Sequence, residues 1–188
     1  DKYVMQRGAC VGAEVAVWQD ENWYWKKEAT DWGYDWREAS KKYLHPKYAP
    51  ANRYARDIIG CLNNWVDGWV DWNMVLDTKG GPNWANNWCI APVIVDTEKD
   101  EVYFTPLYYI MAHFSKYIRP GAIVIDVQNS DKELMVTAAK NPDASIAVVV
   151  FNEGTSIKNF ELSLNGLAKT ISISPQAIQT IVINNDQN

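Results

Sequence analysis

The hydrophobic pattern of the chain changes character near residue 120. Before that point, short runs of β-branched and aromatic residues alternate with segments whose apolar positions follow helical spacing. After it, short apolar runs are separated by polar turns, at 122–128, 134–139, 145–151, 157–164, 168–173 and 178–183. Within one of these runs Phe160, Leu162 and Leu164 alternate with polar residues, as in a strand with one buried face. The second part is therefore predicted to form an antiparallel β-sandwich.

Two helices with an apolar face are predicted in the first part. Pro50 sets the first turn of one helix, and its apolar face is formed by Tyr54, Ile58, Ile59, Leu62, Trp65 and Val66. Thr105 and Pro106 are predicted to cap the second helix, which ends before Pro120-Gly121. Its apolar positions recur at the same spacing, at Leu107, Ile110, Met111, Phe114 and Tyr117. Each helix is expected to bury one face.

Extended segments are predicted before and between the helices of the first part, in the following order along the sequence. Tyr3 to Gln6 forms a short extended run, and Gly68 to Val75 follows the first helix directly, as a parallel strand follows the helix of an αβ unit. Ile90 to Asp96 and Glu101 to Phe104 are predicted as two strands joined by a polar connection. Residues 13–49 are interpreted as a long loop with one short helix near 23–28.

Composition narrows the choice of ligand. The net charge is −5 and no run of Lys or Arg occurs, so a nucleic-acid partner is not expected. No stretch reaches the roughly 20 apolar residues that cross a bilayer, and the chain is predicted to be soluble. Ten tryptophans, all before residue 90, favour either a sugar-binding surface or a tryptophan-rich core. Cys10, Cys61 and Cys89 show neither a disulfide framework nor a zinc pattern.

Separated motifs in the first part carry a family resemblance. They are Ala9-Cys10-Val11-Gly12, Gly68-Trp69-Val70-Asp71-Trp72-Asn73, Gly80-Gly81-Pro82-Asn83-Trp84, Ala91 to Asp96, and His113 to Ile118. Together and in this order they resemble glycoside hydrolase family 30, in its glucosylceramidase-like branch. The resemblance implies an α+β chain in which residues 1–120 supply the last two βα units of a (β/α)8 barrel and residues 121–188 a β-sandwich.

The resemblance also implies a chemistry that this chain does not fully carry. Members of the family are retaining enzymes with two Glu residues, whose carboxyl groups lie about 5 to 5.5 Å apart. The acid/base belongs to an earlier barrel strand, and the nucleophile belongs immediately before the Ala-Cys-Val run, where this chain has Gly8. Glycine has no side chain that could form a glycosyl intermediate. Little or no activity is therefore predicted, and no catalytic residue is assigned.

Substrate-binding positions follow from the same resemblance. Trp72 corresponds to a Trp that lines the sugar site of the family, and Asn73, Trp84 and Asn87 are expected near the same mouth. The alternative to sugar binding is burial in the core for Trp72 and stabilisation of a turn for Asn87. The expected ligand is a β-glucoside or a related carbohydrate, with no cofactor and no metal.

Other carboxylates are candidate replacements for the missing pair. Glu14, Asp20 and Glu21 lie near the relevant loops, and Asp67 and Asp71 share a face of an extended segment. The alternative is structural: Asp67 ends the helix region, and Asp71 is a hydrogen-bonded wall residue. His113 is expected to make a structural hydrogen bond, and His45 is isolated.

Two hypotheses remain open from the sequence. In the first, the chain is a carboxyl-terminal fragment of a retaining β-glucosidase of the glucosylceramidase type. In the second, it is a sugar-binding or self-associating module. A homo-oligomer is predicted in either case, because open strand edges and uncovered apolar faces need partners.

Overall fold

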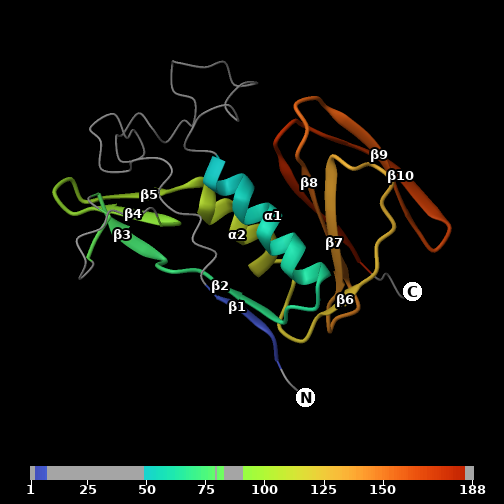
Figure 1. Cartoon of the computed structure of the whole chain (residues 1–188), viewed down its shortest axis with the longest axis horizontal. Helices are drawn as coiled ribbons and strands as arrows, with labels where there is room; N and C mark the ends of the chain where they lie inside the picture. The colour runs from blue at the N-terminus through green and yellow to red at the C-terminus, as the bar shows by residue number, and fades with distance from the viewer. Residues whose placement is uncertain (1–2, 8–48, 79, 83–90, 185–188) are drawn as a thin grey trace.

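The computed structural model describes residues 3–7, 49–78, 80–82 and 91–184 of the chain (Figure 1). Two helices, α1 and α2, lie at the centre of the described part, with a small sheet on one side and the β-sandwich on the other (Figure 1). The elements in chain order are β1 Met5–Arg7, α1 Ala49–Asn63, β2 Gly68–Val70, β3 Val75–Asp77, β4 Val93–Asp96, β5 Glu101–Phe104, α2 Pro106–Ser115, β6 Ile123–Ile125, β7 Leu134–Lys140, β8 Ile146–Asn152, β9 Lys158–Leu164, β10 Leu167–Ile173 and β11 Ile178–Ile183.

The strands β1 and β2 form a parallel pair with α1 between them in sequence. Their register sets Met5 opposite Gly68, Gln6 opposite Trp69 and Arg7 opposite Val70. A parallel pair requires a crossover connection, and a helix that packs back on the sheet is the usual one. The predicted βα units are therefore present, and the fold class inferred from the sequence is confirmed.

The first helix ends earlier than its apolar pattern predicts. The Asn64 side-chain amide donates to the Gly60 carbonyl (2.8 Å), and the Val66 backbone N–H donates to the Cys61 carbonyl (3.1 Å). Trp65 adopts φ 64°, in the left-handed region, and is 84% exposed. These contacts close the helix as a Schellman-type end does, so the inclusion of Trp65 and Val66 in the helical face was wrong.

The segment 68–75 is not one strand. It divides into β2 and the start of β3, and Val75–Asp77 pairs in parallel with Val93–Asp96. The break begins at Asp71, whose carboxylate accepts the backbone N–H of Trp72 (2.7 Å) and so occupies a backbone donor with a local side chain. The two strands predicted on either side of the polar connection are present as β4 and β5, and they pair antiparallel.

The second helix begins at Pro106, as predicted, but Thr105 does not cap it. The Thr105 hydroxyl donates instead to the carbonyls of Ala91 (2.9 Å) and Pro92 (3.1 Å), and no side-chain cap bond forms. Thr105 is buried, and its hydroxyl therefore ties the start of α2 to the segment that leads into β4. The helix ends at Ser115, before the predicted Pro120-Gly121 stop.

The second part is an antiparallel sandwich, as the alternating pattern predicts. One sheet has the order β11-β8-β7-β6, and β9 and β10 form a separate hairpin. The sheet and the hairpin share a core of Leu134, Ala138, Val148, Val150 and Ile173, against which Phe160 and Leu162 pack. Exposure alternates along β9 with period two, which confirms the interpretation of Phe160, Leu162 and Leu164 as the inward-facing set.

The helices and the sandwich share a second core. Ala51, Tyr54, Ala55, Ile58 and Ile59 of α1 and Leu107, Ile110 and Phe114 of α2 cluster with Val149 and Phe151 of β8. Strand β8 therefore buries one set of side chains between the sandwich sheets and the other against the helices. The face of β1 and β2 that points away from α1 does not belong to either core.

Candidate functional site

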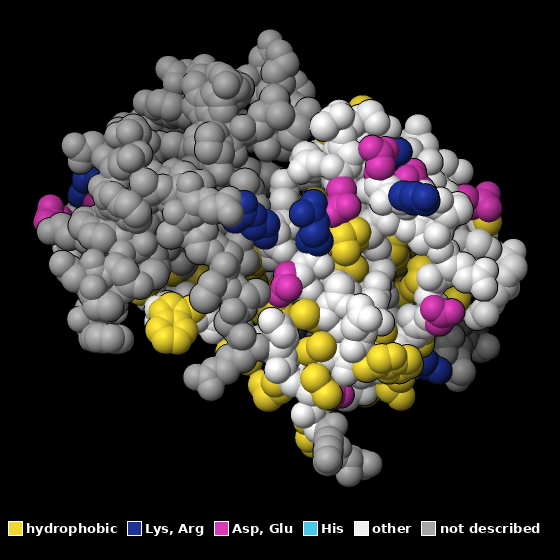
Figure 2. Space-filling model, viewed as in Figure 1, with side chains coloured by type: hydrophobic (Ala, Val, Ile, Leu, Met, Phe, Trp, Pro, Cys, Tyr) yellow, Lys and Arg dark blue, Asp and Glu magenta, His cyan; other side chains and the backbone are white. Residues whose placement is uncertain are grey.

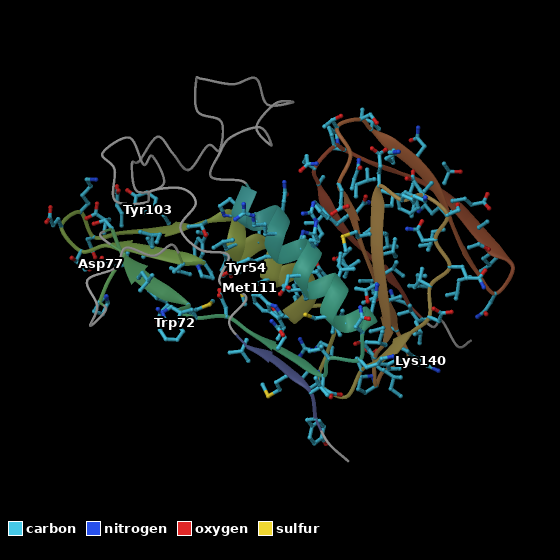
Figure 3. The ribbon with its side chains drawn as sticks, in the orientation of Figure 1. Tyr54, Trp72, Asp77, Tyr103, Met111 and Lys140 are labelled. Atoms are coloured by element: carbon cyan, nitrogen blue, oxygen red, sulfur yellow. The ribbon has the colours of Figure 1, made fainter. Side chains whose placement is uncertain are left out.

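The candidate site lies beyond the carboxyl end of β2, where barrel enzymes place their catalytic and binding residues. Asp71, Trp72 and Asn73 follow Val70 directly. Trp72 is 70% exposed and Asn73 is half-buried. In Figure 3 Trp72 projects from the connection between β2 and β3, away from the helices. An exposed indole held on a short, anchored connection is suited to stacking on the apolar face of a ring.

Asp71 is the anchor of this connection. One carboxylate oxygen, Oδ1, accepts hydrogen bonds from the Tyr54 hydroxyl (2.6 Å) and from the backbone N–H of Trp72 (2.7 Å). The other oxygen, Oδ2, is buried and has no hydrogen-bond partner in the described part of the chain. Oδ1 fixes the backbone at Trp72, and Oδ2 is a buried acceptor without a donor among the described residues.

A second hydrogen bond joins α1 to β2 at Trp69, two residues before Asp71. The Trp69 indole N–H donates to Asp57 Oδ2 at 2.5 Å. The rings of Trp69 and Tyr54 meet edge to face, with their centroids 5.1 Å apart. Tyr54 and Asp57 are three residues apart on α1, and Asp71, just beyond the end of β2, is two residues after Trp69, so the two pairs face each other.

Sequence reasoning missed Tyr54 and Asp57 as supports of the site. Tyr54 was interpreted only as a core residue, and Asp57 was not singled out. The signal that could have found them is the matched spacing: two polar side chains at i and i+3 of a helix, followed by a Trp on the next strand and an Asp two residues later, just past its end. Such pairing becomes apparent only when the helix is packed on the strand.

Asp67 and Asp71, two of the candidate replacement carboxylates, have structural partners. Asp67 Oδ2 accepts the backbone N–H of Val4 (2.7 Å), and the Asp67 backbone N–H donates to the Val4 carbonyl (2.7 Å). Asp67 thus joins the start of β1 to the start of β2 and does not end α1, which corrects that part of the prediction. Asp71 is the hydrogen-bonded wall residue that the structural interpretation predicts. Glu14, Asp20 and Glu21 lie outside the described residues.

His113 also has the structural role that was predicted for it. Its Nδ1 lies 2.8 Å from the Thr180 hydroxyl, which connects α2 to β11. Burial lowers the pKa of His113 below its ordinary value of 6.5, so the imidazole is neutral near neutral pH. His45 lies outside the described residues.

Of the predicted substrate-binding residues, the structure places Trp72 and Asn73 together at the end of β2. Gly8, Trp84 and Asn87 lie outside the described residues. The Gly80-Gly81 turn that precedes Trp84 is held by Asp77, whose carboxylate accepts the Gly81 N–H (2.8 Å). The turn therefore starts from β3, beside the same connection.

Within the described ranges, no group of three or more His, Cys, Asp or Glu side chains is arranged to hold a metal ion. Cys61 is half-buried, and its pKa is raised by burial and by the nearby Asp57 carboxylate, so its thiol stays protonated near neutral pH. Neither of the described helices combines the length and apolar character needed to span a bilayer.

Two βα units that continue into an antiparallel sandwich, with an exposed Trp beyond a strand end, are the arrangement of a barrel-type glycoside hydrolase. Residues 21–118 match the model of the glycosyl hydrolase family 30 TIM-barrel domain, and residues 121–181 match that of the glycosyl hydrolase family 30 beta sandwich domain. The chain belongs to glycosyl hydrolase family 30.

Relatives and solved structures agree with this assignment. The lysosomal acid glucosylceramidase of Mus musculus is 38% identical over 124 residues, which are 65% of this chain and 24% of the relative. SrfJ from Salmonella typhimurium superposes with a TM-score of 0.73 at 27% identity, over 76% of this chain and 32% of SrfJ. The endo-beta1,6-glucanase BT3312 gives a TM-score of 0.65 at 25% identity, over 71% of this chain and 31% of that protein. The chain thus spans about a quarter of the mouse relative's length and about a third of these structures.

Proposed function

We propose that this chain is the carboxyl-terminal portion of a retaining β-glucosidase of the glucosylceramidase type and that alone it hydrolyses glucosides weakly or not at all. Residues 1–120 would supply the barrel portion and residues 121–188 the sandwich. The observation that carries the proposal is the anchored Asp71-Trp72-Asn73 segment at the carboxyl end of β2, where the family places a sugar-contacting Trp. The relatives named above include a glucosylceramidase, which supports a β-glucoside as the ligand.

Lack of activity is expected because neither the nucleophile nor the acid/base carboxylate is assigned to a residue of this chain. Double displacement needs an attacking carboxylate and a proton donor about 5 to 5.5 Å from it. The position of the nucleophile in the family motif is Gly8, and the acid/base belongs to a strand that precedes this motif. Asp67 accepts a hydrogen bond from Val4, and Asp71 accepts hydrogen bonds from Tyr54 and Trp72. These structural contacts support the exclusion of both carboxylates as replacements.

Hydrolysis of an aryl β-glucoside tests the proposal. The purified chain is expected to release no more aglycone than a buffer blank, and Gly8→Glu alone is expected to restore no turnover because the proton donor is still absent. Robust activity of the unmodified chain would contradict the proposal, and Asp71→Asn and Asp67→Asn would then show whether either carboxylate is responsible.

Sugar binding without turnover is a second candidate function, and the exposure of Trp72 favours it. Indole stacking on a sugar ring does not need the missing carboxylates. Calorimetric titration with a β-glucoside is expected to show binding that Trp72→Ala abolishes. Trp65→Ala is the matched control, because Trp65 is also exposed, 84% against 70%, but follows the end of α1. Equal loss in both variants would assign the effect to general destabilisation.

Self-association is the remaining part of the proposal. A groove of about 950 Å³ is lined by residues including Val4, Trp65, Ile118 and Ile123, and Trp65 and Ile123 are 84% and 70% exposed. Hydrophobic side chains gather over β1 and β6 on the face shown in Figure 2. Contiguous apolar surface of this kind favours association between copies. Sedimentation should give a mass above that of one chain, and Ile123→Glu should lower it; a monomer at all concentrations would rule this out.

A further inference from the structure

Two hydrogen bonds converge on one oxygen of Asp71. The Tyr54 hydroxyl donates to Oδ1 at 2.6 Å, and the backbone N–H of Trp72 donates to the same atom at 2.7 Å. The carboxylate orientation that Tyr54 fixes is therefore the orientation that the Trp72 N–H meets. Because Trp72 follows Asp71 directly, the second bond restricts the backbone that carries the indole. Tyr54 is thus linked to Trp72 through a single oxygen atom.

Tyr54 is itself held in place. It is 5% exposed and belongs to the core that α1, α2 and β8 share. Its ring meets that of Trp69 edge to face, and the Trp69 indole N–H donates to Asp57. A buried aromatic ring with packed neighbours on both α1 and β2 has little freedom to turn. The Tyr54 hydroxyl therefore has a defined position relative to β2.

The two side-chain hydrogen bonds between α1 and the β2 segment also fix their register. Tyr54 and Asp57 are about 4.5 Å apart along the helix axis, at about 1.5 Å per residue. Trp69 and Asp71 are about 6.6 Å apart along an extended chain, at about 3.3 Å per residue. The earlier residue of the helix meets the later residue of the β2 segment, and the later one meets the earlier. A shift of α1 by one residue of β2, about 3.3 Å, would break both bonds.

The direction of the Trp72 indole depends on its backbone, because little of the side chain is packed. Trp72 is 70% exposed. Figure 3 shows Tyr54 at α1, whereas Trp72 projects from the connection between β2 and β3, away from the helices. The link from the Tyr54 hydroxyl to the indole therefore runs through Asp71 and the Trp72 backbone.

We propose that Tyr54 is a positioning residue for sugar binding: through Asp71, its hydroxyl holds the Trp72 indole in the orientation that stacks on a β-glucoside. This assignment rests on the proposed function, in which Trp72 contacts the sugar. An indole that is already held loses less conformational entropy when the ligand binds, so the hydroxyl increases affinity. If Tyr54 were only a core residue, removal of the hydroxyl would lower stability and leave affinity unchanged.

Calorimetric titration with methyl β-glucoside measures the effect on affinity. Tyr54→Phe keeps the ring in the core and its contact with Trp69, and removes only the hydroxyl. It should weaken binding about three- to tenfold, the loss expected when the ligand itself must order one side chain. Tyr103→Phe is the matched control, because Tyr103 is 4% exposed and its hydroxyl also donates to a carboxylate, that of Glu101 on β5. The control should leave affinity unchanged; equal affinities of the two variants would overturn the inference.

The magnetic resonance line of Trp72 is a readout that a purely structural role of Tyr54 would not change. In a chain made with fluorine-labelled tryptophan, the Trp72 line is identified by its absence from Trp72→Phe. Tyr54→Phe should shift or broaden this line, because the indole then samples more orientations, whereas Tyr103→Phe should leave it unchanged. The measurement needs no ligand. An unaltered Trp72 line in Tyr54→Phe would mean that the hydroxyl does not hold the indole.

A double-mutant cycle tests the route through Asp71. Asp71→Ala should weaken binding at least as much as Tyr54→Phe, and the two changes together should weaken it no further than Asp71→Ala alone. Asp71→Asn is the conservative variant, and it should keep affinity within about twofold of the unmodified chain, because an amide oxygen still accepts both hydrogen bonds. Additive losses in the cycle, or a large loss in Asp71→Asn, would overturn the hydrogen-bonded route.

The role of Tyr54 and the proposed sugar binding can fail separately. Binding that Trp72→Ala abolishes and Tyr54→Phe leaves intact would overturn the role of Tyr54 alone. No binding by the unmodified chain would count against sugar binding at Trp72, and the fluorine spectrum of Tyr54→Phe would still decide whether the hydroxyl holds the indole.

Discussion

At the scale of single residues, side chains of α1 hold Trp69 of β2 and the segment that follows the strand in place. Tyr54 holds Asp71 and Asp57 holds Trp69, at 2.6 and 2.5 Å. Both donors and acceptors are partly buried, where such hydrogen bonds are strengthened by the lower dielectric. The exposed Trp72 is therefore attached to a backbone that is fixed on its helix side, which limits the entropy lost when its indole stacks on a ligand.

His113 gives a pH dependence that can be measured. Burial lowers its folded-state pKa below the ordinary value of 6.5, so the unfolded chain binds this proton first as pH falls. Its contribution to stability is complete above pH 6.5 and is lost as pH falls through the lower folded-state pKa. The free energy of unfolding should therefore decline between pH 7.5 and pH 5.5, and less steeply in His113→Gln.

Urea unfolding at the two pH values checks this difference. Thr180→Val is the control, because it removes the hydroxyl that lies 2.8 Å from Nδ1 and leaves the imidazole in place. It should lower stability at both pH values while retaining the slope. Identical slopes in the unmodified chain and in His113→Gln would show that another group titrates in this range.

At the scale of elements, Asn141 connects α2 to the sandwich. Its Oδ1 accepts the Arg119 N–H (2.9 Å), and its Nδ2 donates to the Tyr117 carbonyl (2.9 Å) and the Ser145 hydroxyl (3.1 Å). Asn141 is 6% exposed and follows β7 directly. The segment after α2 is thus held to the β7–β8 turn by one side chain.

Asn141→Ala should destabilise the fold by about 2 kcal/mol, because it leaves the partly buried Arg119 N–H and Tyr117 carbonyl without their partner. Chemical denaturation measures the change. Asn159→Ala on β9 is the matched control: Asn159 is exposed, and its loss should change stability by less than about 0.5 kcal/mol. A similar cost for both variants would mean that the Asn141 bonds contribute nothing specific.

Elements with a strong local pattern were predictable from the sequence, and those decided by tertiary pairing were not. Strand β9 follows from the alternation of Phe160, Leu162 and Leu164, which requires only one buried face. The division of 68–75 does not, because β3 pairs with β4 and Asp71 captures a local N–H. The same limit applies to the site: a family resemblance points to Trp72, whereas its support by Tyr54 appears only once α1 is packed on β2.

At the scale of the molecule, the two parts share one core through β8. Val149 and Phe151 pack with residues of α1 and α2, while Val148 and Val150 pack with the opposite sheet of the sandwich. Adjacent residues of a strand point to opposite faces, so β8 packs against other elements on both of its faces. Unfolding of either part exposes the apolar surface of the other, and the described parts should therefore unfold together.

Phe151 allows this coupling to be tested, because all ten tryptophans precede residue 90. Tryptophan fluorescence then reports only the barrel portion, while far-UV circular dichroism includes the sandwich strands. Phe151 is 1% exposed, and Phe151→Ala should cost about 3 to 5 kcal/mol. Phe151→Leu is the milder variant that keeps the fold measurable. Both probes should shift to lower denaturant by the same amount, since a cavity between β8 and the helices weakens both parts. If the fluorescence transition stays in place while the dichroism transition shifts, the barrel portion and the sandwich unfold independently.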